Sequence, residues 1–341
     1  MGARSKPGWW WKVEKVEVKP SIIMGTPAAK APRPPSLPDL IAIVDNVPID
    51  FETNCAPYYR LHISPDPRTH GYVHPNTVSR MPWPSSFIIN HDDRRITLSP
   101  CPPATSLSVH ANAAFQQAVD AAIDNSIFPT LNGMHSEHFR VMGARSFVQI
   151  ERFAASLFGI ATRGAHLTCY VRAARGPPKI WVARRSANML TYPGLLDSTV
   201  AGGVKADHSP LDCILAEATE EASLPEDLVA KHVRSVGVVT LANRNARTDL
   251  HHSEVLYVYD LELPAGVVPR PQDGEVDEFV LMDCDEVQRR MVGLEFKPNV
   301  CPVMIDFMIR HGVITPEQER EYVEICNRLR RKLPVPTTSD E

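Results

Sequence analysis

The sequence has no long apolar run and no strong excess of charge of either sign. A membrane-spanning helix needs roughly 20 consecutive apolar residues, and no stretch of the 341 residues approaches that length. The formal net charge is -4, which argues against a general nucleic-acid binder. We therefore expect a soluble protein whose partner is neither a membrane nor a nucleic acid.

Cysteine pairs are also missing. The seven cysteines are scattered, without a Cys-x-x-Cys pair or a histidine at zinc spacing. Such an odd, dispersed set is typical of reduced thiols in the cytosol or nucleus. The N-terminus lacks the continuous apolar core of a secretory signal. The cytoplasm is the expected compartment, with an organelle as the alternative, and Cys213 is expected on the solvent side of its helix without a catalytic role.

Proline and apolar residues divide the chain unevenly. The length and the 43% hydrophobic content predict two domains with sizeable cores. The N-terminal segment is rich in proline and is expected to be disordered. Short apolar runs and one helix, at 113–125, then predict a smaller α+β domain. The predicted boundaries are 1–38 for the tail, 39–145 for the α+β accessory domain, 146–332 for the second domain and 333–341 for a C-terminal tail.

The second domain alternates strand-like and helical patterns, which predicts an α/β fold with a mixed sheet. The predicted strands are 166–172, 179–184, 233–241, 253–263 and 275–282. The predicted helices are 147–157, one that begins at Ser209, one that Ser223 caps in a capping box with Glu226, then 283–291, 302–311 and 316–332.

The most informative segment lies at 217–225. It places Glu217, Glu220 and Glu221 at i, i+3 and i+4, so that they share one face of a helix. Ser209 suits the N-cap and Pro210 the first turn. The apolar stripe of this helix comprises Leu211, Ile214, Leu215, Ala218 and Ala222. The three carboxylates are therefore expected to point away from the core.

Three clustered carboxylates repel one another unless solvent screens them or a hard cation lies between them. Carboxylate oxygens suit Mg²⁺, and Mn²⁺ is the alternative. The preceding glycines, Gly202 and Gly203, allow the backbone to approach a ligand closely. An ordinary solvated helix face is the competing interpretation of such a segment taken alone.

The segment resembles the signature of the Nudix hydrolase family, which runs Gly, five residues, Glu, seven residues, Arg-Glu-apolar-x-Glu-Glu-x-Gly-apolar. Counted from Gly202, with Gly203 as the alternative start, the retained positions are Gly202, Glu217, Ala218, Glu220, Glu221 and Leu224. His208 replaces the first Glu, Ala216 the Arg and Ser223 the last Gly. In the family the Arg holds the neighbouring carboxylates, so Ala216 is expected to loosen the site.

Other segments are similar to one Nudix subfamily, the thiamine-diphosphate-related group of fungi and plants, often labelled thiamine pyrophosphokinase-related. They lie at 181–186, 192–203, 257–264, 273–279, 296–299 and 306–312. This resemblance implies an α/β/α sandwich behind an N-terminal accessory domain. It also implies Mg²⁺-dependent hydrolysis of thiamine diphosphate, or of its oxidised and damaged analogues, to the monophosphate. We expect no kinase activity, because the chain stops at Glu341 soon after this region.

Roles for individual residues follow from the resemblance and from charge. Glu217 and Glu221 are expected as direct metal ligands, and Glu220 as a ligand or base. A fourth carboxylate is expected from Glu275 or Glu278, of which strand alternation allows only one to face the site. The predicted substrate-binding residues are Arg184, Arg185, Gly202, Gly203 and Lys297, because a diphosphate needs compensating cations and close backbone approach.

Two other functions stay open at this point. The same fold could hydrolyse another substrate of the nucleoside-diphosphate type, because the loops that select the organic part are not decoded by the sequence. A degenerate module could instead bind a diphosphate without turnover, an alternative supported by His208, Ala216 and Ser223. The expected partner is in every case a small-molecule diphosphate, and assembly as a homodimer is compatible with the sequence.

Overall fold

The computed structural model describes residues 33–133 and 137–339, so the predicted tail at 1–32 lies outside the described residues. Residues 37 and 38, which were assigned to that tail, begin helix α1 (Leu37–Val44) instead. The side chain of Ser36 accepts a hydrogen bond from the backbone N–H of Asp39, and Asp39 returns the contact in a capping box. Local capping therefore starts the helix before the predicted boundary.

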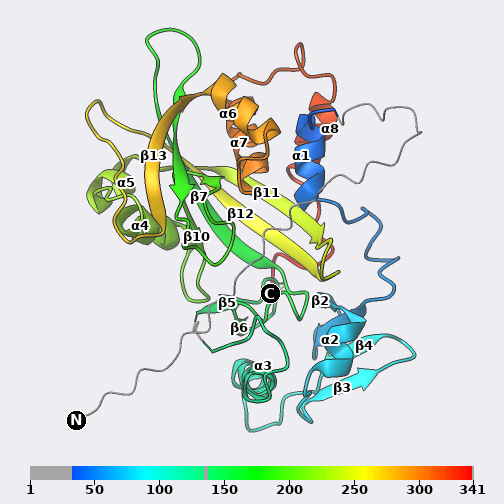
Figure 1. Cartoon of the computed structure of the whole chain (residues 1–341). Helices are drawn as coiled ribbons and strands as arrows, with labels where there is room; N and C mark the ends of the chain where they lie inside the picture. The colour runs from blue at the N-terminus through cyan, green and yellow to red at the C-terminus, as the bar shows by residue number, and fades with distance from the viewer. Residues whose placement is uncertain (1–32, 134–136, 340–341) are drawn as a thin grey trace, which may run out of the picture. The chain divides into compact units, whose positions relative to one another are not determined.

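A seven-stranded mixed sheet lies at the centre of the C-terminal half (Figure 1). The strand order is β11-β12-β7-β8-β13, with β10 paired to β7 and β9 paired to β8. Strands β12 and β7 run parallel, whereas the other pairs are antiparallel. The bounds are Thr162–Val171 for β7, Lys179–Arg185 for β8, Leu196–Asp197 for β9, Val200–Gly203 for β10, Arg234–Arg244 for β11, His251–Glu262 for β12 and Val276–Asp283 for β13. All five predicted strands are confirmed.

Helices cover both faces of this sheet (Figure 1). On one face, Ile214 and Ala218 of α4 (Pro210–Glu220) pack in one apolar cluster with Leu167 of β7. On the other, Phe307 of α7 (Val300–Arg310) packs in a second cluster with Val258 of β12. Burying a side chain of the size of Leu167, Ile214 or Phe307 contributes about 1.5–3 kcal/mol to the free energy of unfolding. The predicted α/β/α sandwich with a mixed sheet is confirmed.

Several helices differ from the prediction. The helix predicted at 147–157 is wrong: the chain forms strand β6 (Gln149–Glu151) and then turns, in which the Glu151 carboxylate accepts a hydrogen bond from the Ala154 N–H at 2.8 Å. The helix predicted at 316–332 shortens to α8 (Tyr322–Arg328). Helix α6 spans Cys284–Val292, as predicted to within one residue at each end.

The turn after α4 also corrects the prediction. Ser223 has a φ of +52° and is not an N-cap. Its hydroxyl donates to the Arg270 carbonyl at 3.1 Å, so α5 (Glu226–His232) begins after Pro225 without a side-chain cap. Cys213 was expected toward solvent but is 4% exposed, because it faces β10 and its thiol donates to the Gly203 carbonyl at 3.7 Å. Leu211, predicted in the apolar stripe, is 39% exposed.

The N-terminal region contains a four-stranded sheet in the order β2-β1-β4-β3 and the helix α3. Phe115 of α3 and Phe158 pack edge to face at 5.3 Å in its core. The helix predicted at 113–125 is confirmed, but it starts earlier. The bounds are Tyr59–Ile63 for β1, Thr69–Val73 for β2, Pro75–Arg80 for α2, Phe87–Asn90 for β3, Arg95–Leu98 for β4, Leu107–Asp124 for α3 and His138–Arg140 for β5, which pairs with β6.

Both ends of the described chain pack into the fold. Ile41 of α1 belongs to the apolar cluster of α7 and β12, not to the cluster of the N-terminal sheet. Leu333 and Val335, which were predicted to lie in a C-terminal tail, are 4% and 7% exposed. Tyr72 Oη donates to the Pro334 carbonyl at 3.0 Å. The segments at 37–44 and 333–335 are thus part of the core.

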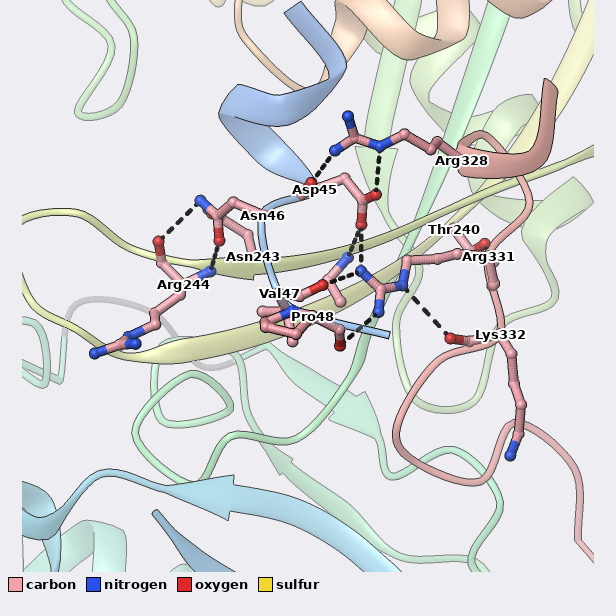
Figure 2. Close-up of polar contacts among 11 residues, drawn as sticks. Asp45, Asn46, Val47, Pro48, Thr240, Asn243, Arg244, Arg328, Arg331 and Lys332 are labelled. Atoms are coloured by element: carbon pink, nitrogen blue, oxygen red, sulfur yellow. Dashed lines mark hydrogen bonds and ion pairs between the residues drawn. The ribbon is translucent and has the colours of Figure 1, made fainter. Parts of the chain in front are cut away.

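A buried carboxylate joins these two ends. Figure 2 shows Asp45, which follows α1, accepting hydrogen bonds from two arginines near the C-terminus. Arg331 Nη1 lies 2.9 Å from one carboxylate oxygen, and Arg328 Nε lies 3.3 Å from the other. The N–H of Ala242 in β11 also donates to Asp45, at 3.1 Å. One carboxylate therefore holds α1, β11 and α8 together.

In the ranges 33–133 and 137–339, no helix has the length and apolar character needed to cross a bilayer.

Candidate active site

A polar pocket of about 430 Å³ lies where α4, β7, β10 and the loop before β13 meet. Most of the residues predicted for the site line it. They are Glu217, Glu220, Glu275, Arg185, Gly202, Gly203 and Lys297. Glu221, Arg184 and Glu278 are not among the lining residues. The fold thus brings residues from five separate segments to one place.

Helix α4 positions the central carboxylates. Ser209 and Asp212 form a capping box at its start, and its buried residues fix its orientation on the sheet. The three carboxylates do not all face solvent as predicted. Glu220 is exposed, but Glu221 is only 6% exposed, and its carboxylate accepts a hydrogen bond from the Ala201 N–H at 3.2 Å. Strand β10 covers Glu221, which helical periodicity could not reveal.

The backbone of Gly202 lies directly against Glu217. A Cβ atom at Gly202 would be 2.3 Å from Glu217 Oε1, which is closer than real Cβ contacts allow. The missing side chain therefore leaves the place that the carboxylate occupies. The two glycines were expected to let the backbone approach a ligand; in the structure Gly202 makes its close approach to the side chain of Glu217 instead.

Burial and like charge act together on these groups. Burial, with Glu220, Glu275 and Glu137 adding to it and Lys205 opposing it, raises the pKa of Glu217 to about 7. Burial and then Glu217 raise the pKa of Glu221 well above its ordinary value. A divalent cation beside such carboxylates would displace their protons and relieve the repulsion.

The donor set fits a hard cation in type. Within the described ranges, no three His, Cys, Asp or Glu side chains already converge as a ready-made metal site. The side chains present nevertheless offer carboxylate oxygens, which such ions prefer as ligands. One of these carboxylates, that of Glu217, packs against the backbone of Gly202. In the same ranges no salt bridge joins Glu217 or Glu221 to a lysine or arginine, so the charge that Ala216 leaves out is not replaced by a direct ion pair.

Two of the predicted cations share one buried carboxylate. Arg185 Nη1 lies 2.9 Å from Asp197 Oδ2, and Lys297 Nζ lies 3.4 Å from the same oxygen. Burial works against ionisation, but Lys297, His166 and Arg185 hold the pKa of Asp197 below its ordinary value. Because Arg185 and Lys297 share the single carboxylate of Asp197, these three side chains together carry one net positive charge, which suits a phosphate.

The third predicted cation points elsewhere. Arg184 Nε donates to Glu278 Oε1 at 2.7 Å, and neither residue lines the pocket. A register shift in the β8–β13 pair places Glu278 opposite Arg184. Glu275 precedes this shift, and its N–H donates to Asp273 Oδ1 at 2.9 Å. Of the two candidate glutamates, only Glu275 lies at the pocket.

Sequence reasoning missed several lining residues. Glu137, Phe139, Arg152 and Phe153 come from or flank β5 and β6. His166, Arg163, His252, Glu254 and Asn299 come from the sheet and from the start of α7. No spacing pattern marked these positions, because they come together only through the packing of distant segments. Their mixture of charges makes the pocket suited to a polar, anionic ligand.

Comparison with known proteins agrees with this geometry. The family model described as "NUDIX domain" matches residues 162–300. A yeast protein, the uncharacterized protein YJR142W of Saccharomyces cerevisiae, is 35% identical over 67% of this chain and 70% of its own length. Nudix hydrolase 20 and Nudix hydrolase 24 of Arabidopsis thaliana, both named as chloroplastic, are 36% and 37% identical over 61% and 58% of this chain. The chain spans about half the length of these two plant relatives, at 55% and 54%.

Proposed function

Because residues 162–300 match the NUDIX domain model, we propose that the chain is a metal-dependent diphosphatase that cleaves a diphosphate linked to an organic group. The observation that carries this proposal is that the Glu217 carboxylate packs against the backbone of Gly202 in the pocket that Arg185 and Lys297 also line. Carboxylates for a cation and cations for a phosphate are the two requirements of phosphoanhydride hydrolysis.

Glu217 and Glu221 are the side chains that would hold the metal, with Glu220 as a further ligand or a base. Nudix hydrolases generally use divalent metals, and we propose Mg²⁺ here, with Mn²⁺ as an alternative. The bound ion would neutralise phosphate charge and acidify the attacking water. The contribution of the chain is to supply oxygen ligands on a helix whose position is fixed by buried apolar contacts.

Arg185 and Lys297 are proposed to orient the phosphates. Their attachment to Asp197 restricts both side chains, so less conformational entropy is lost when a substrate binds. Glu275 is proposed as the fourth carboxylate, because it lies at the pocket and interacts electrostatically with Glu217. Arg184 and Glu278 are not proposed for the site, since they pair with each other outside it.

For the organic group we propose thiamine diphosphate or its oxidised and damaged analogues. This choice is supported by the similarity of the segments at 192–203, 273–279 and 296–299 to the thiamine-diphosphate-related subfamily. Two alternatives are another diphosphate of the nucleoside type and a module that binds without turnover. We propose the cytoplasm or an organelle as the compartment, and a monomer or a homodimer as the state of assembly.

Hydrolysis by the purified protein, followed by chromatography of the organic monophosphates formed, tests the proposal, because ADP-ribose and dinucleotides release no inorganic phosphate when their diphosphate bond is cleaved. The panel comprises thiamine diphosphate, its oxo and oxy analogues, ADP-ribose and dinucleotides, each with Mg²⁺. The Glu221→Gln and Glu220→Gln variants are measured beside Glu278→Gln, which changes the same residue type outside the pocket. We expect turnover of the thiamine compounds by wild type and Glu278→Gln, with a loss of about 100-fold or more in Glu221→Gln.

The other outcomes separate the alternatives. Turnover confined to ADP-ribose or dinucleotides would replace the thiamine assignment but keep the enzyme class. No turnover of any compound, together with retained binding, would replace the enzyme by the binding module. Equal activity in Glu221→Gln and Glu278→Gln would contradict the assignment of the site.

A further inference from the structure

We propose that Arg152, carried by the β5–β6 hairpin, binds phosphate oxygens of the substrate, so that a segment outside the NUDIX match completes the active site. This inference rests on the proposed function, because it assumes a diphosphate ligand in the pocket. The matched residues begin at 162. Arg152 and its neighbour Glu137 precede them, yet both line the pocket with Glu217 and Glu220.

Backbone hydrogen bonds fix the hairpin beside the segment that contains Gly202 and Gly203. The N–H of Ala206, three residues after Gly203, donates to the His138 carbonyl at 2.8 Å. Within the hairpin, the N–H of Arg152 donates to the Glu137 carbonyl at 3.0 Å. The hairpin is therefore hydrogen-bonded to the segment that directly follows β10, the strand in which Gly202 contacts Glu217.

The ring of Phe139 makes a second contact between the hairpin and this segment. A Cβ atom at Gly203 would be 2.7 Å from Phe139 Cζ, so the ring rests on the glycine backbone. Gly202 holds the Glu217 carboxylate one residue earlier in the same strand. The hairpin and the carboxylates thus contact adjacent residues of β10, and Arg152 is placed within the same pocket.

The guanidinium of Arg152 is held in place on several sides. Its Cζ lies 5.7 Å from the ring centroids of both Phe139 and Phe153. Its Nη1 donates to Glu137 Oε2 at 2.7 Å. No hydrogen bond of Nε or Nη2 is found within the described residues. Ring contacts and one ion pair hold the guanidinium, while its remaining donors are left for a ligand.

The charges on this side of the pocket are positive on balance. Glu137 is shared, because Lys205 Nζ also lies 3.4 Å from its other oxygen. Burial works against ionisation, but Arg152 and Lys205 hold the pKa of Glu137 below its ordinary value. Arg163, half buried nearby, donates to the Lys205 carbonyl at 2.8 Å and adds another cation. Three cations and one carboxylate thus line this part of the pocket.

A diphosphate suits this division of charge. The carboxylates of α4 would hold a metal that neutralises phosphate charge, and Arg152 would donate hydrogen bonds to phosphate oxygens from the other side of the pocket. Arginine offers two parallel N–H donors to a phosphate, which a lysine cannot do. The competing role for Arg152 is structural, in which it only ties the hairpin together through Glu137.

Binding of imidodiphosphate, a diphosphate that resists hydrolysis, tests the inference on the full chain with Mg²⁺. Arg152→Gln is compared with Arg140→Gln, which removes the same side chain from β5 where it lies over Phe147 at 5.4 Å and does not line the pocket. We expect Arg152→Gln to weaken imidodiphosphate binding about tenfold or more and to raise KM with little change in kcat. Arg140→Gln should bind as wild type does.

A second variant separates binding from folding. Glu137→Gln removes the competing anion from Arg152 and Lys205, so we expect tighter binding of imidodiphosphate, whereas a purely structural ion pair predicts no gain. Unchanged binding in Arg152→Gln, or unchanged or weaker binding in Glu137→Gln, would overturn the inference. A defect toward thiamine diphosphate but not toward imidodiphosphate would also overturn it, since Arg152 would then contact the organic group. These titrations need no turnover, so an absence of hydrolysis would contradict the proposed function without deciding this test.

Discussion

At the scale of single residues, Gly202 is the position where the smallest change should have the most specific effect. In Gly202→Ala, the new Cβ would overlap Glu217 Oε1, which lies 2.3 Å from its place. Because the overlapping atoms belong to a flexible side chain, we expect the carboxylate to move and the fold to survive. Activity should fall about 100-fold, with little change in Tm.

The matched control is Gly293→Ala, where the nearest atom to the new Cβ is 3.3 Å away and lies outside the pocket. Activity measurements and thermal melts on both variants check the prediction. Normal activity in Gly202→Ala, or a collapse of Tm without a specific loss of activity, would contradict it.

Metal binding should depend on pH through Glu217. In the metal-free protein the pKa of this carboxyl is raised to about 7, so below that pH a cation must displace a proton. We expect Mg²⁺ affinity to rise as pH increases from 6 to 8, because Glu217 and Glu221, whose pKa is also raised, both bind the metal as carboxylates. Calorimetric titration at several pH values, in buffers of different ionisation enthalpy, measures both affinity and proton release; a constant affinity with no proton release would show that the carboxylate is already ionised.

His251 should make the fold sensitive to acid. It is 1% exposed, stacks on Phe51 at 4.9 Å, and has no hydrogen-bond partner for either ring nitrogen within the described residues. Burial, with His252 and Arg331 adding to it, lowers its pKa to about 3. Because the unfolded chain binds a proton near pH 6.5 and the native ring does not, the free energy of unfolding falls as pH drops from about 6.5 toward 3.

The variant His251→Phe should remove this dependence. Between pH 7.5 and 4.5 the wild type should lose about 2–3 kcal/mol more stability than the variant. Urea unfolding of both proteins at pH 7.5 and pH 4.5 gives the stability that each loses between the two pH values. Comparing these two losses removes any pH-independent packing effect of the larger ring. Equal losses would mean that the native structure accommodates a charged ring at position 251.

At the scale of secondary-structure elements, the joint around Asp45 should contribute strongly to stability. The side chains of Asp45 and Arg331 are 4% and 9% exposed. Asp45→Ala would leave Arg331 buried without its carboxylate, and breaking a buried pair in this way costs about 3–5 kcal/mol. Denaturant unfolding checks the value, with Glu52→Gln as a control, because its exposed contact to Lys332 should contribute little.

The elements that could be predicted from the sequence are those with a clear period. Five strands of the central sheet follow from apolar spacing, and helix α4 follows from its apolar spacing and the cap at Ser209, whereas the short strands β9 and β10 were not predicted. The segment at 147–157 misled because its apolar residues are buried by turns that Glu151 stabilises, not by a helix. Periodicity reports only which residues are buried, so it could not distinguish these two ways of burying them.

The sequence predicted the glutamates and glycines of the candidate site, but not the residues that reach it through contacts between distant segments. The three glutamates of α4 and the two glycines have a fixed spacing, which a sequence displays directly. The pairing of Arg184 with Glu278 depends on a register shift between two strands, and the position of Arg152 depends on how a hairpin docks. Such features come from tertiary contacts between distant segments, which one sequence does not display.

At the scale of the whole molecule, the catalytic half should need α1 although 118 positions of chain separate Val44 from the first matched residue, Thr162. Leu40 and Ile41 are 1% and 0% exposed in the cluster with α7. We expect a fragment of residues 47–341 to expose this cluster and to aggregate or melt at lower temperature than a fragment of residues 33–341. Equal Tm values and solubility would show that the sheet is stable without the helix.

The joint at Asp45 also has a consequence for synthesis of the protein. Asp45 leaves the ribosome early, but its partner Arg328 lies 283 positions further along the chain. The apolar face of helix α1 therefore stays exposed on the nascent chain until α7 and Arg328 have been synthesised. Such a long sequence separation slows folding and prolongs the exposure of apolar surface. The core around α1 can form only after α7 has been synthesised, so nascent chains that stall before residue 300 would leave the apolar face of α1 exposed.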